Sequence, residues 1–280
     1  MRAAADGFGG LILPQVGFAD WATRQLAIAA LFGAFALPVA AHAEVKAPVC
    51  DAPMDMIRLN HPLKHLAQKL AAGAPITIVA VGSSSTAGAG ASSPAANYPN
   101  RLAGDLKWRF PGYSITVLNR GVGGEEIGDM LKRFDNAVVA EKPDLVLWQL
   151  GTNSVLRNHP VNDHGAAIRA GLEKIRATGA DVVLIDPQFA PKVIVKPGAE
   201  TMVDLISLTA KQENVDLFHR FAVMKRWHDV DRMAFASFVS PDGLHMNDWS
   251  YACLAKGLGQ AIAEAAQRPV VSAAVMSMVP

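Results

Sequence analysis

Five short apolar runs, separated by longer amphipathic stretches, limit this 280-residue chain to a narrow set of folds. The runs are continuous and rich in Val, Ile and Leu, and they lie at 76–82, 115–119, 144–150, 181–186 and 215–218. Continuous runs of this kind are typical of strands buried on both faces of a parallel sheet. Helical spacing of apolar residues recurs at 98–109, 125–140, 163–178, 200–213 and 248–267. Strand and helix therefore alternate, which predicts an α/β fold, a three-layer α/β/α sandwich with a central parallel sheet of about five strands.

The N-terminal segment has the features of an export signal. An uncharged apolar run at 26–41 follows Arg24 and leads into Ala41-His42-Ala43, which has the small-x-small form of a signal-peptidase site. A membrane anchor is the alternative, but a span needs about 20 apolar residues. We therefore expect residues 1–43 to be removed after Ala43, leaving a secreted or periplasmic protein with no stable membrane insertion.

The mature chain is expected to form one domain. Residues 44–75 read as an N-terminal extension with one helix, 76–268 as the body and 269–280 as a tail; no linker rich in Gly, Ser or Pro divides the body. A hydrophobic share of 51% excludes general disorder. A net charge of +1 argues against a nucleic-acid partner, because such proteins usually carry a basic excess.

Two cysteines, Cys50 and Cys253, remain after the predicted cleavage. An exported protein enters an oxidising compartment, where a disulfide between them is expected to tie the mature N-terminus to the last helix. Two unpaired buried thiols are the equally weighted alternative, because the sequence alone does not set the geometry.

Chemically useful residues follow the predicted strands. In an open parallel sheet the ligand crevice lies outside the carboxyl ends of the strands. The segments at this edge are 82–88 (GSSSTAG), 119–124 (NRGVGG) and 151–154 (GTNS), and 241–245 (PDGLH) precedes the last helix. A serine, flexible backbone donors, an amide and an Asp/His pair are thus predicted to meet in one crevice.

These four segments, in this order, resemble the blocks of the SGNH hydrolases, or GDSL-like esterases and lipases, over roughly residues 76–265. The resemblance implies the flavodoxin-like fold of that family and a serine ester hydrolase. It places the nucleophile at Ser84, the acid and base of the triad at Asp242 and His245, and the oxyanion-hole residues at Gly124 and Asn153.

Two positions depart from the family pattern. Ser83 stands where the family has an Asp before the nucleophile, and Ser154 stands where an Asp often follows the Asn of the third block. Neither is a triad position, so activity is expected to survive. The serine-rich first block leaves Ser83 and Ser85 open as alternative nucleophiles.

The residue types suit acyl transfer independently of the resemblance. A neutral imidazole at His245 can take the proton of Ser84, while Asp242 fixes the tautomer of the ring. The N–H groups of Ser84 and Gly124 and the amide of Asn153 can stabilise the oxyanion of the tetrahedral intermediate.

Other residues near the predicted crevice have simpler interpretations. Asp186 is an alternative acid, but a helix cap or a pocket wall is the preferred interpretation. Trp148, inside a predicted strand, is assigned to the core, and Arg120 and Gln188 are possible crevice-lining residues.

Rival chemistries fit the sequence poorly. There is no Lys for a P-loop, the glycines at 121–124 lack the third Gly of a dinucleotide fingerprint, and Thr86 breaks the GxSxG pattern of an ordinary α/β-hydrolase. No cluster has zinc-like spacing, so neither a metal nor an organic cofactor is expected.

The substrate is only broadly defined by the sequence. With no long apolar lid segment, we favour a small-molecule or carbohydrate ester with an acetyl or short acyl group. A periplasmic lysophospholipase or acyl thioesterase is one alternative. A non-catalytic ligand-binding domain on the same fold is the other.

Overall fold

Five parallel strands form the central sheet of the structure, a computed structural model that describes residues 50 and 52–269. The strands are β1 (Ile76–Gly82), β2 (Ile115–Gly121), β3 (Leu145–Gln149), β4 (Asp181–Ile185) and β5 (Asp216–Phe218). Their order across the sheet is β2-β1-β3-β4-β5, and each neighbouring pair is parallel. The predicted fold class is confirmed, and each strand begins within one residue of its predicted start.

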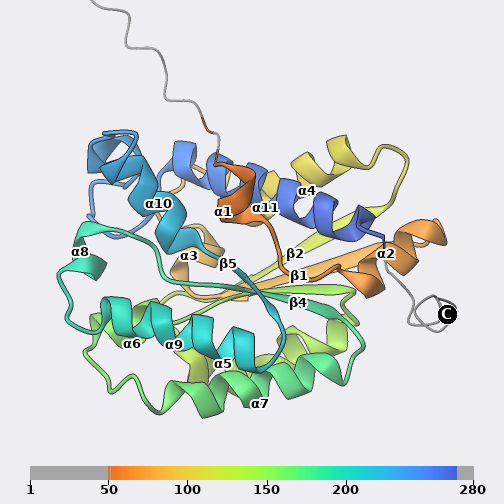
Figure 1. The fold of residues 1–280 in the computed structure, drawn as a ribbon, viewed down its shortest axis with the longest axis horizontal. Helices are drawn as coiled ribbons and strands as arrows, with labels where there is room; N and C mark the ends of the chain where they lie inside the picture. The colour runs from red at the N-terminus through yellow and green to blue at the C-terminus, as the bar shows by residue number, and fades with distance from the viewer. Residues whose placement is uncertain (1–49, 51, 270–280) are drawn as a thin grey trace, which may run out of the picture. The chain divides into compact units, whose positions relative to one another are not determined.

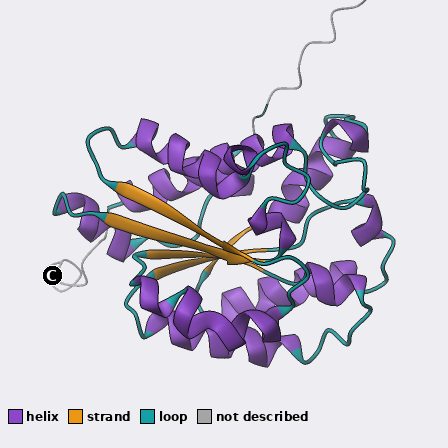
Figure 2. Cartoon of the chain, turned by 180° about the vertical axis from the view of Figure 1, so that it is seen from behind, coloured by secondary structure: helices purple, strands orange, loops and turns teal. Residues whose placement is uncertain are grey.

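Helices cover both faces of this sheet (Figures 1 and 2). One layer holds α1 (Met54–Ile57), α4 (Tyr98–Arg109), α10 (Arg220–Asp229) and α11 (Asp248–Gln267), with α2 (Lys64–Ala71) contacting α11. The other holds α5 (Ile127–Ala137), α7 (His164–Arg176) and α9 (Ala199–Gln212). Covering both faces explains why the strands are continuously apolar; every residue of β3 is buried.

Short helices lie where strands end. They are α3 (Ser84–Ala87) after β1, α6 (Thr152–Leu156) after β3 and α8 (Pro191–Ile194) after β4. Three 3₁₀ turns in the described part of the chain cover Pro94–Ala96, Val139–Glu141 and Phe235–Ser237. The strand order reverses between β1 and β3. Ligands of open parallel sheets bind at such a switch point, and the segments that begin α3 and α6 follow these two strands.

The long helices largely agree with the sequence prediction. The ranges 98–109 and 248–267 are reproduced as predicted, whereas α10 and the three short helices were not predicted. The extension contains α1 and α2 where one helix was expected.

The predicted signal at 1–43 and nearly all of the predicted tail lie outside the described residues. Within the described ranges no helix has the length and apolar character needed to cross a membrane.

The predicted disulfide is present: Cys50 is bonded to Cys253 on α11, so the chain just before α1 is joined to the last helix. The Cα atoms of the two residues are 5.2 Å apart. This bond closes a loop that spans nearly the whole described domain, with a sequence separation of 203 residues.

Three aspartates at the amino ends of adjacent strands hold the extension against the sheet. Asp144 Oδ1 lies 2.8 Å from His65 Nε2, and Asp144 Oδ2 accepts from the backbone N–H of Thr77 at 2.8 Å. Asp181 Oδ2 accepts from the N–H of Leu66 at 2.9 Å. Asp216 Oδ1 accepts from the backbone N–H groups of residues 60 and 61, at 2.6 and 3.1 Å. This edge of the sheet is therefore used for attachment.

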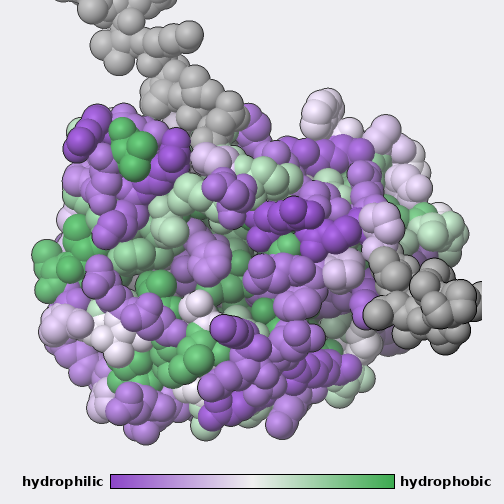
Figure 3. Space-filling view, viewed as in Figure 1, coloured by the Kyte–Doolittle hydropathy of each residue, from purple (hydrophilic) through white to green (hydrophobic). Residues whose placement is uncertain are grey.

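The surface on the face shown in Figure 3 is mostly hydrophilic, with separate hydrophobic patches. The exposed large hydrophobic residues of the described chain include Val195 just after α8, Leu208 on α9 and Val230 just after α10. Scattered apolar residues of this kind are normal on protein surfaces and need no partner to explain them.

Candidate active site

Ser84 begins α3 directly after β1, at a tight turn. A Cβ at Gly82 would lie 2.2 Å from Thr86 Oγ1 and 2.8 Å from Gln149 Oε1, so only glycine lets the chain turn here. The turn is fixed by Gln149 at the end of β3, whose Oε1 accepts from the N–H and hydroxyl of Ser83 at 3.0 and 3.1 Å. The Ser83 hydroxyl is therefore buried and already hydrogen-bonded to Gln149.

Ser84 is the serine that reaches the predicted base. Its Oγ lies 2.8 Å from His245 Nε2, and Ser84 is partly exposed, whereas Ser83 and Ser85 are 2% and 1% exposed. The hydroxyl of Ser85 has no hydrogen-bond partner. Of the three serines that the sequence left open, the structure joins Ser84 to the Asp/His pair.

Asp242 holds the other side of the imidazole. Its Oδ2 lies 2.5 Å from His245 Nδ1. Its Oδ1 accepts from the backbone N–H groups of Leu244 and His245, both at 2.9 Å, and from the hydroxyl of Ser240 at 2.7 Å. The carboxylate is thus fixed by its own loop while one oxygen faces the histidine ring.

The electrostatics of Asp242 favour the ionised form. Partial burial opposes ionisation, but the hydrogen bonds from the His245 ring and from surrounding backbone and hydroxyl groups outweigh it, so the pKa of Asp242 lies well below its usual value. An ionised carboxylate only accepts hydrogen bonds, so Nδ1 must carry the proton between them. In the neutral ring, Nε2 is then free to accept from Ser84.

The segment that begins at the last residue of β2 and covers residues 121–126 is called the glycine loop below. It approaches Ser84: a Cβ added at Gly123 would lie 3.9 Å from Ser84 Cβ. Gly124 has a φ of 80°, in the left-handed region that favours glycine. Asn153, on α6, donates from Nδ2 to the carbonyl of Glu125 at 2.8 Å, which leaves the second N–H of its amide available.

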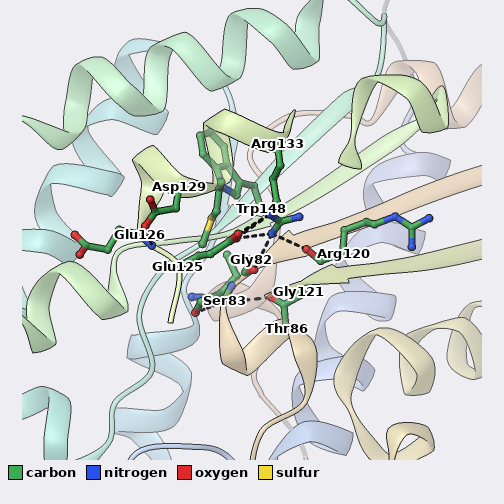
Figure 4. A network of polar contacts seen from close by, with 12 residues as sticks. Gly82, Ser83, Thr86, Arg120, Gly121, Glu125, Glu126, Asp129, Arg133 and Trp148 are labelled. Atoms are coloured by element: carbon green, nitrogen blue, oxygen red, sulfur yellow. Dashed lines mark hydrogen bonds and ion pairs between the residues drawn. The ribbon is translucent and has the colours of Figure 1, made fainter. Parts of the chain in front are cut away.

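A partly buried cation joins the glycine loop to the sheet (Figure 4). Arg133 on α5 donates from Nε to both oxygens of Glu125 at 2.8 Å, and from Nη2 to one of them at 2.6 Å. The same Nη2 donates to the carbonyls of Arg120 at 2.9 Å and Gly82 at 3.3 Å. The ends of β1 and β2 and the glycine loop therefore share one anchor, which the sequence interpretation missed.

Among the other residues singled out in the sequence, Asp186 and Trp148 are buried. Asp186 Oδ1 accepts from the N–H of Phe221 at 2.8 Å, in the first turn of α10, which fits the interpretation as a cap. Burial raises the pKa of this carboxyl to about 7. Trp148 packs edge-to-face on Phe134 with ring centroids 4.9 Å apart, as a core residue.

The two polar residues proposed to line the crevice have different surroundings. The Arg120 guanidinium binds Glu141, with Nη2 2.6 Å from Oε1. Gln188 accepts from the hydroxyl of Thr152 at 2.9 Å and donates to the carbonyl of Leu244 at 3.3 Å. It therefore joins α6 to the loop that carries His245.

In the described part of the chain, no group of three or more His, Cys, Asp or Glu side chains is arranged to hold a metal ion. A cavity of about 450 Å³ is lined by residues such as Asp181 and Asp216 at the opposite edge of the sheet. A cavity of about 370 Å³ lies beside the Asp242 loop, between Phe235, Pro191 and Pro241.

Residues 49–268 match the model of the non-GDSL lipase-like family. Because this match covers well over half of the chain, the protein belongs to that family. This confirms the resemblance to SGNH hydrolases that the four blocks indicated.

The chain is similar in sequence to proteins that are named as esterases. The chain is 27% identical over 134 residues to an arylesterase of Vibrio mimicus, covering 48% of this chain and 63% of the relative. It is 30% identical over 102 residues to an acetylxylan esterase of Geobacillus stearothermophilus, covering 33% of this chain and 47% of the relative. The chain thus spans about half the length of these curated relatives.

A solved structure gives the same fold. A two-domain esterase active on acetylated mannans superposes with a TM-score of 0.64 at 20% identity, covering 76% of this chain and 56% of that one. At this identity the likeness concerns the fold alone.

Proposed function

We propose that the protein is a serine carboxylic ester hydrolase that works through an acyl-Ser84 intermediate. The observation that carries this proposal is the unbroken chain of contacts from Asp242 through His245 to Ser84, at 2.5 and 2.8 Å. The esterase names of the relatives support the same reaction class.

Acylation would begin with attack by the serine oxygen. Ser84 Oγ forms a bond to the ester carbonyl carbon while its proton moves to His245 Nε2. The carbonyl electron pair moves onto oxygen, and Asp242 stabilises the imidazolium that has formed. When the intermediate collapses, the alcohol leaves with the proton from His245.

Stabilisation of the oxyanion would fall to three donors: the N–H of Ser84, the N–H of Gly124 and the free N–H of the Asn153 amide. The support is positional, because the glycine loop lies beside Ser84 and Asn153 is bound to that loop. Fixed donors of this kind act on charge that develops only in the transition state.

Deacylation repeats the proton transfer with water. His245 takes a proton from a water molecule as its oxygen attacks the acyl carbon, and the proton returns to Ser84 Oγ as the acid is released. The reaction therefore consumes one ester and one water molecule and needs no cofactor.

We assign the substrate to esters with a small acyl group, acetyl or short-chain, on a carbohydrate or small alcohol. The support is the absence of a long apolar lid in the sequence and the substrates in the names of the acetylxylan and acetylated-mannan esterases. Export after removal of residues 1–43 belongs to the same proposal, and a mature N-terminus at Glu44 of secreted protein would support it, whereas one at Met1 would contradict it.

A panel of p-nitrophenyl esters tests the reaction and the acyl preference together. Acetyl and butyryl esters should be hydrolysed faster than decanoyl and palmitoyl esters. Ser84→Ala should remove turnover, whereas the matched control Ser85→Ala should keep it, because the Ser85 hydroxyl has no partner to lose. A preference for long chains would favour a lysophospholipase or thioesterase, and turnover unaffected by Ser84→Ala would overturn the proposal.

A further inference from the structure

The carboxylate of Glu126, at the end of the glycine loop, gathers three side chains from the segment that begins with α6. Glu126 Oε2 accepts from the Ser154 hydroxyl at 2.8 Å and lies 2.9 Å from His159 Nδ1. Glu126 Oε1 accepts from Arg157 Nη1 at 2.6 Å. The Glu126 side chain is only 16% exposed, whereas its partners Arg157 and His159 are about half exposed, so the carboxylate lies inside a cluster that is open to solvent on its outer side.

The same segment also binds the backbone of the glycine loop. Arg157 Nη2 donates to the carbonyl of Gly124 at 2.9 Å, next to the bond from Asn153 to the Glu125 carbonyl. At the start of α5, the backbone of Glu126 is also bound: its N–H donates to Asp129 Oδ2 at 3.3 Å, and its carbonyl accepts from the N–H of Asp129 at 3.1 Å. Glu126 is therefore the common anchor of the glycine loop, α5 and α6.

Glu126 is held in its charged form. Burial opposes ionisation, but hydrogen bonds from His159, Ser154 and Arg157 outweigh it and lower the pKa of the carboxyl. A charged acceptor makes stronger hydrogen bonds than a neutral one, which suits a residue that holds two segments together.

The contact to Ser154 bears on a departure seen in the sequence. Ser154 stands where an aspartate often follows the asparagine of the third block in the family that this chain resembles. Here the Ser154 hydroxyl instead donates to a carboxylate beside it, that of Glu126, 28 residues earlier.

We propose that Glu126 is a positioning residue that holds the N–H of Gly124 and the amide of Asn153 in register for oxyanion stabilisation, in place of a carboxylate at position 154. This role rests on the proposed ester hydrolysis. It acts through the two donors, so it concerns the transition state more than substrate binding, and misplacement of such groups by about 1 Å can cost up to 10²-fold in rate.

The first test is Glu126→Gln, which keeps the shape of the side chain and removes its charge. The kcat for p-nitrophenyl acetate should fall about 10- to 100-fold while KM changes by less than about twofold. The affinity for phenylboronic acid, which forms a tetrahedral anion on the serine, should fall in parallel. The matched control is Glu213→Gln, which breaks another arginine pair, Arg176 Nη1 to Glu213 Oε2 at 2.9 Å, and should leave kcat unchanged.

The second test is rescue by relocating the charge. Ser154→Asp in the Glu126→Gln background returns a carboxylate to the same place and should recover most of the lost kcat. Ser154→Asp alone should lower kcat, because it sets two carboxylates side by side. A wild-type kcat in Glu126→Gln, or a loss that Ser154→Asp does not recover, would overturn the role of Glu126. Ser84→Ala measured alongside separates this from a failure of the proposed hydrolysis, which would show as turnover that persists without Ser84.

Discussion

Aspartates lie at both edges of the sheet, the one formed by the amino ends of the strands and the one formed by their carboxyl ends, but they have different roles there. At the amino edge, Asp144, Asp181 and Asp216 each accept from backbone N–H groups of the strand or extension beside them. At the carboxyl edge, Asp242 also accepts from backbone, but its second oxygen faces His245, which contacts Ser84.

The difference lies in where each chain of hydrogen bonds ends. The hydrogen bonds at the amino edge run to backbone groups and basic side chains of the extension and of β1, so they fix the position of these segments. The chain at the carboxyl edge ends on a hydroxyl that can give up a proton. Variants at the carboxyl edge should therefore lower activity and leave stability largely unchanged, and variants at the amino edge should do the reverse.

The largest expected effect is that of Asp242→Asn. The amide of asparagine cannot stabilise the imidazolium, and it favours the wrong tautomer of His245, so kcat should fall about 10⁴-fold. The midpoint of thermal unfolding should fall only modestly, because the Asp242 side chain is 43% exposed and solvent screens its interactions. Steady-state hydrolysis of p-nitrophenyl acetate measures the first effect, and activity within tenfold of wild type would show that Asp242 has no catalytic role.

Asn153→Ala should have the next largest effect. Loss of one oxyanion donor typically costs about 10²- to 10³-fold in kcat. The control is Asn100→Ala, which removes a comparable bond from a side-chain amide to the carbonyl of Pro94, 2.7 Å long, on an exposed part of α4. The Asn100→Ala variant should keep the wild-type kcat. If Asn153→Ala kept it too, Asn153 would not be an oxyanion donor.

The disulfide should affect stability alone. Replacing Cys50 and Cys253 together by alanine should lower the free energy of unfolding by about 2–4 kcal/mol, as is typical for bonds that close long loops. The kcat of the folded variant should stay near wild type, because neither sulfur belongs to the site. Urea unfolding and kcat measured on the same sample check both parts. A kcat that fell while the free energy of unfolding stayed unchanged would contradict a purely stabilising role of the disulfide.

The smallest expected effect is at the amino edge, where Asp144→Asn should lower the free energy of unfolding by about 1–3 kcal/mol at pH 7. Burial opposes ionisation of Asp144, but hydrogen bonds from Thr77, His65 and Lys69 outweigh it and lower its pKa in the folded protein. Its stabilising contribution is therefore present above the unfolded pKa of about 4 and is lost as the pH falls toward the folded pKa.

Urea unfolding at pH 7 and pH 3 checks the sign of that effect. The difference between wild type and Asp144→Asn should shrink at the lower pH, and a difference that grew would contradict it. Asp181→Asn is the matched comparison: burial is the main influence on Asp181 and raises its pKa, so loss of its charge at pH 7 should cost less than at Asp144.

The sequence was sufficient for the sheet and for the segments that make up the candidate site, because both depend on local patterns. Buried strands appear as continuous apolar runs, and the site residues follow the strand ends. The sequence could not choose among Ser83, Ser84 and Ser85, because the choice depends on how the first turn of α3 is oriented toward His245, 161 residues away.

Contacts between distant segments account for what was missed. Nothing local to Glu126 or Ser154 shows that the two side chains meet. The amino-edge aspartates did leave a signal, because Asp144, Asp181 and Asp216 each stand at or near the start of a predicted apolar run. In the structure this repeated aspartate is a backbone acceptor, for the extension at Asp181 and Asp216 and for β1 at Asp144.

The central claim is that Ser84 is the acylated nucleophile, and covalent labelling tests it most directly. The protein would be inactivated with diisopropyl fluorophosphate, digested with trypsin, and the peptide 70–101, which contains all three serines of the first block, fragmented in a mass spectrometer. We expect one adduct per chain, on Ser84, formed in proportion to the loss of esterase activity. An adduct on Ser83 or Ser85, or full inactivation with Ser84 unmodified, would contradict the account.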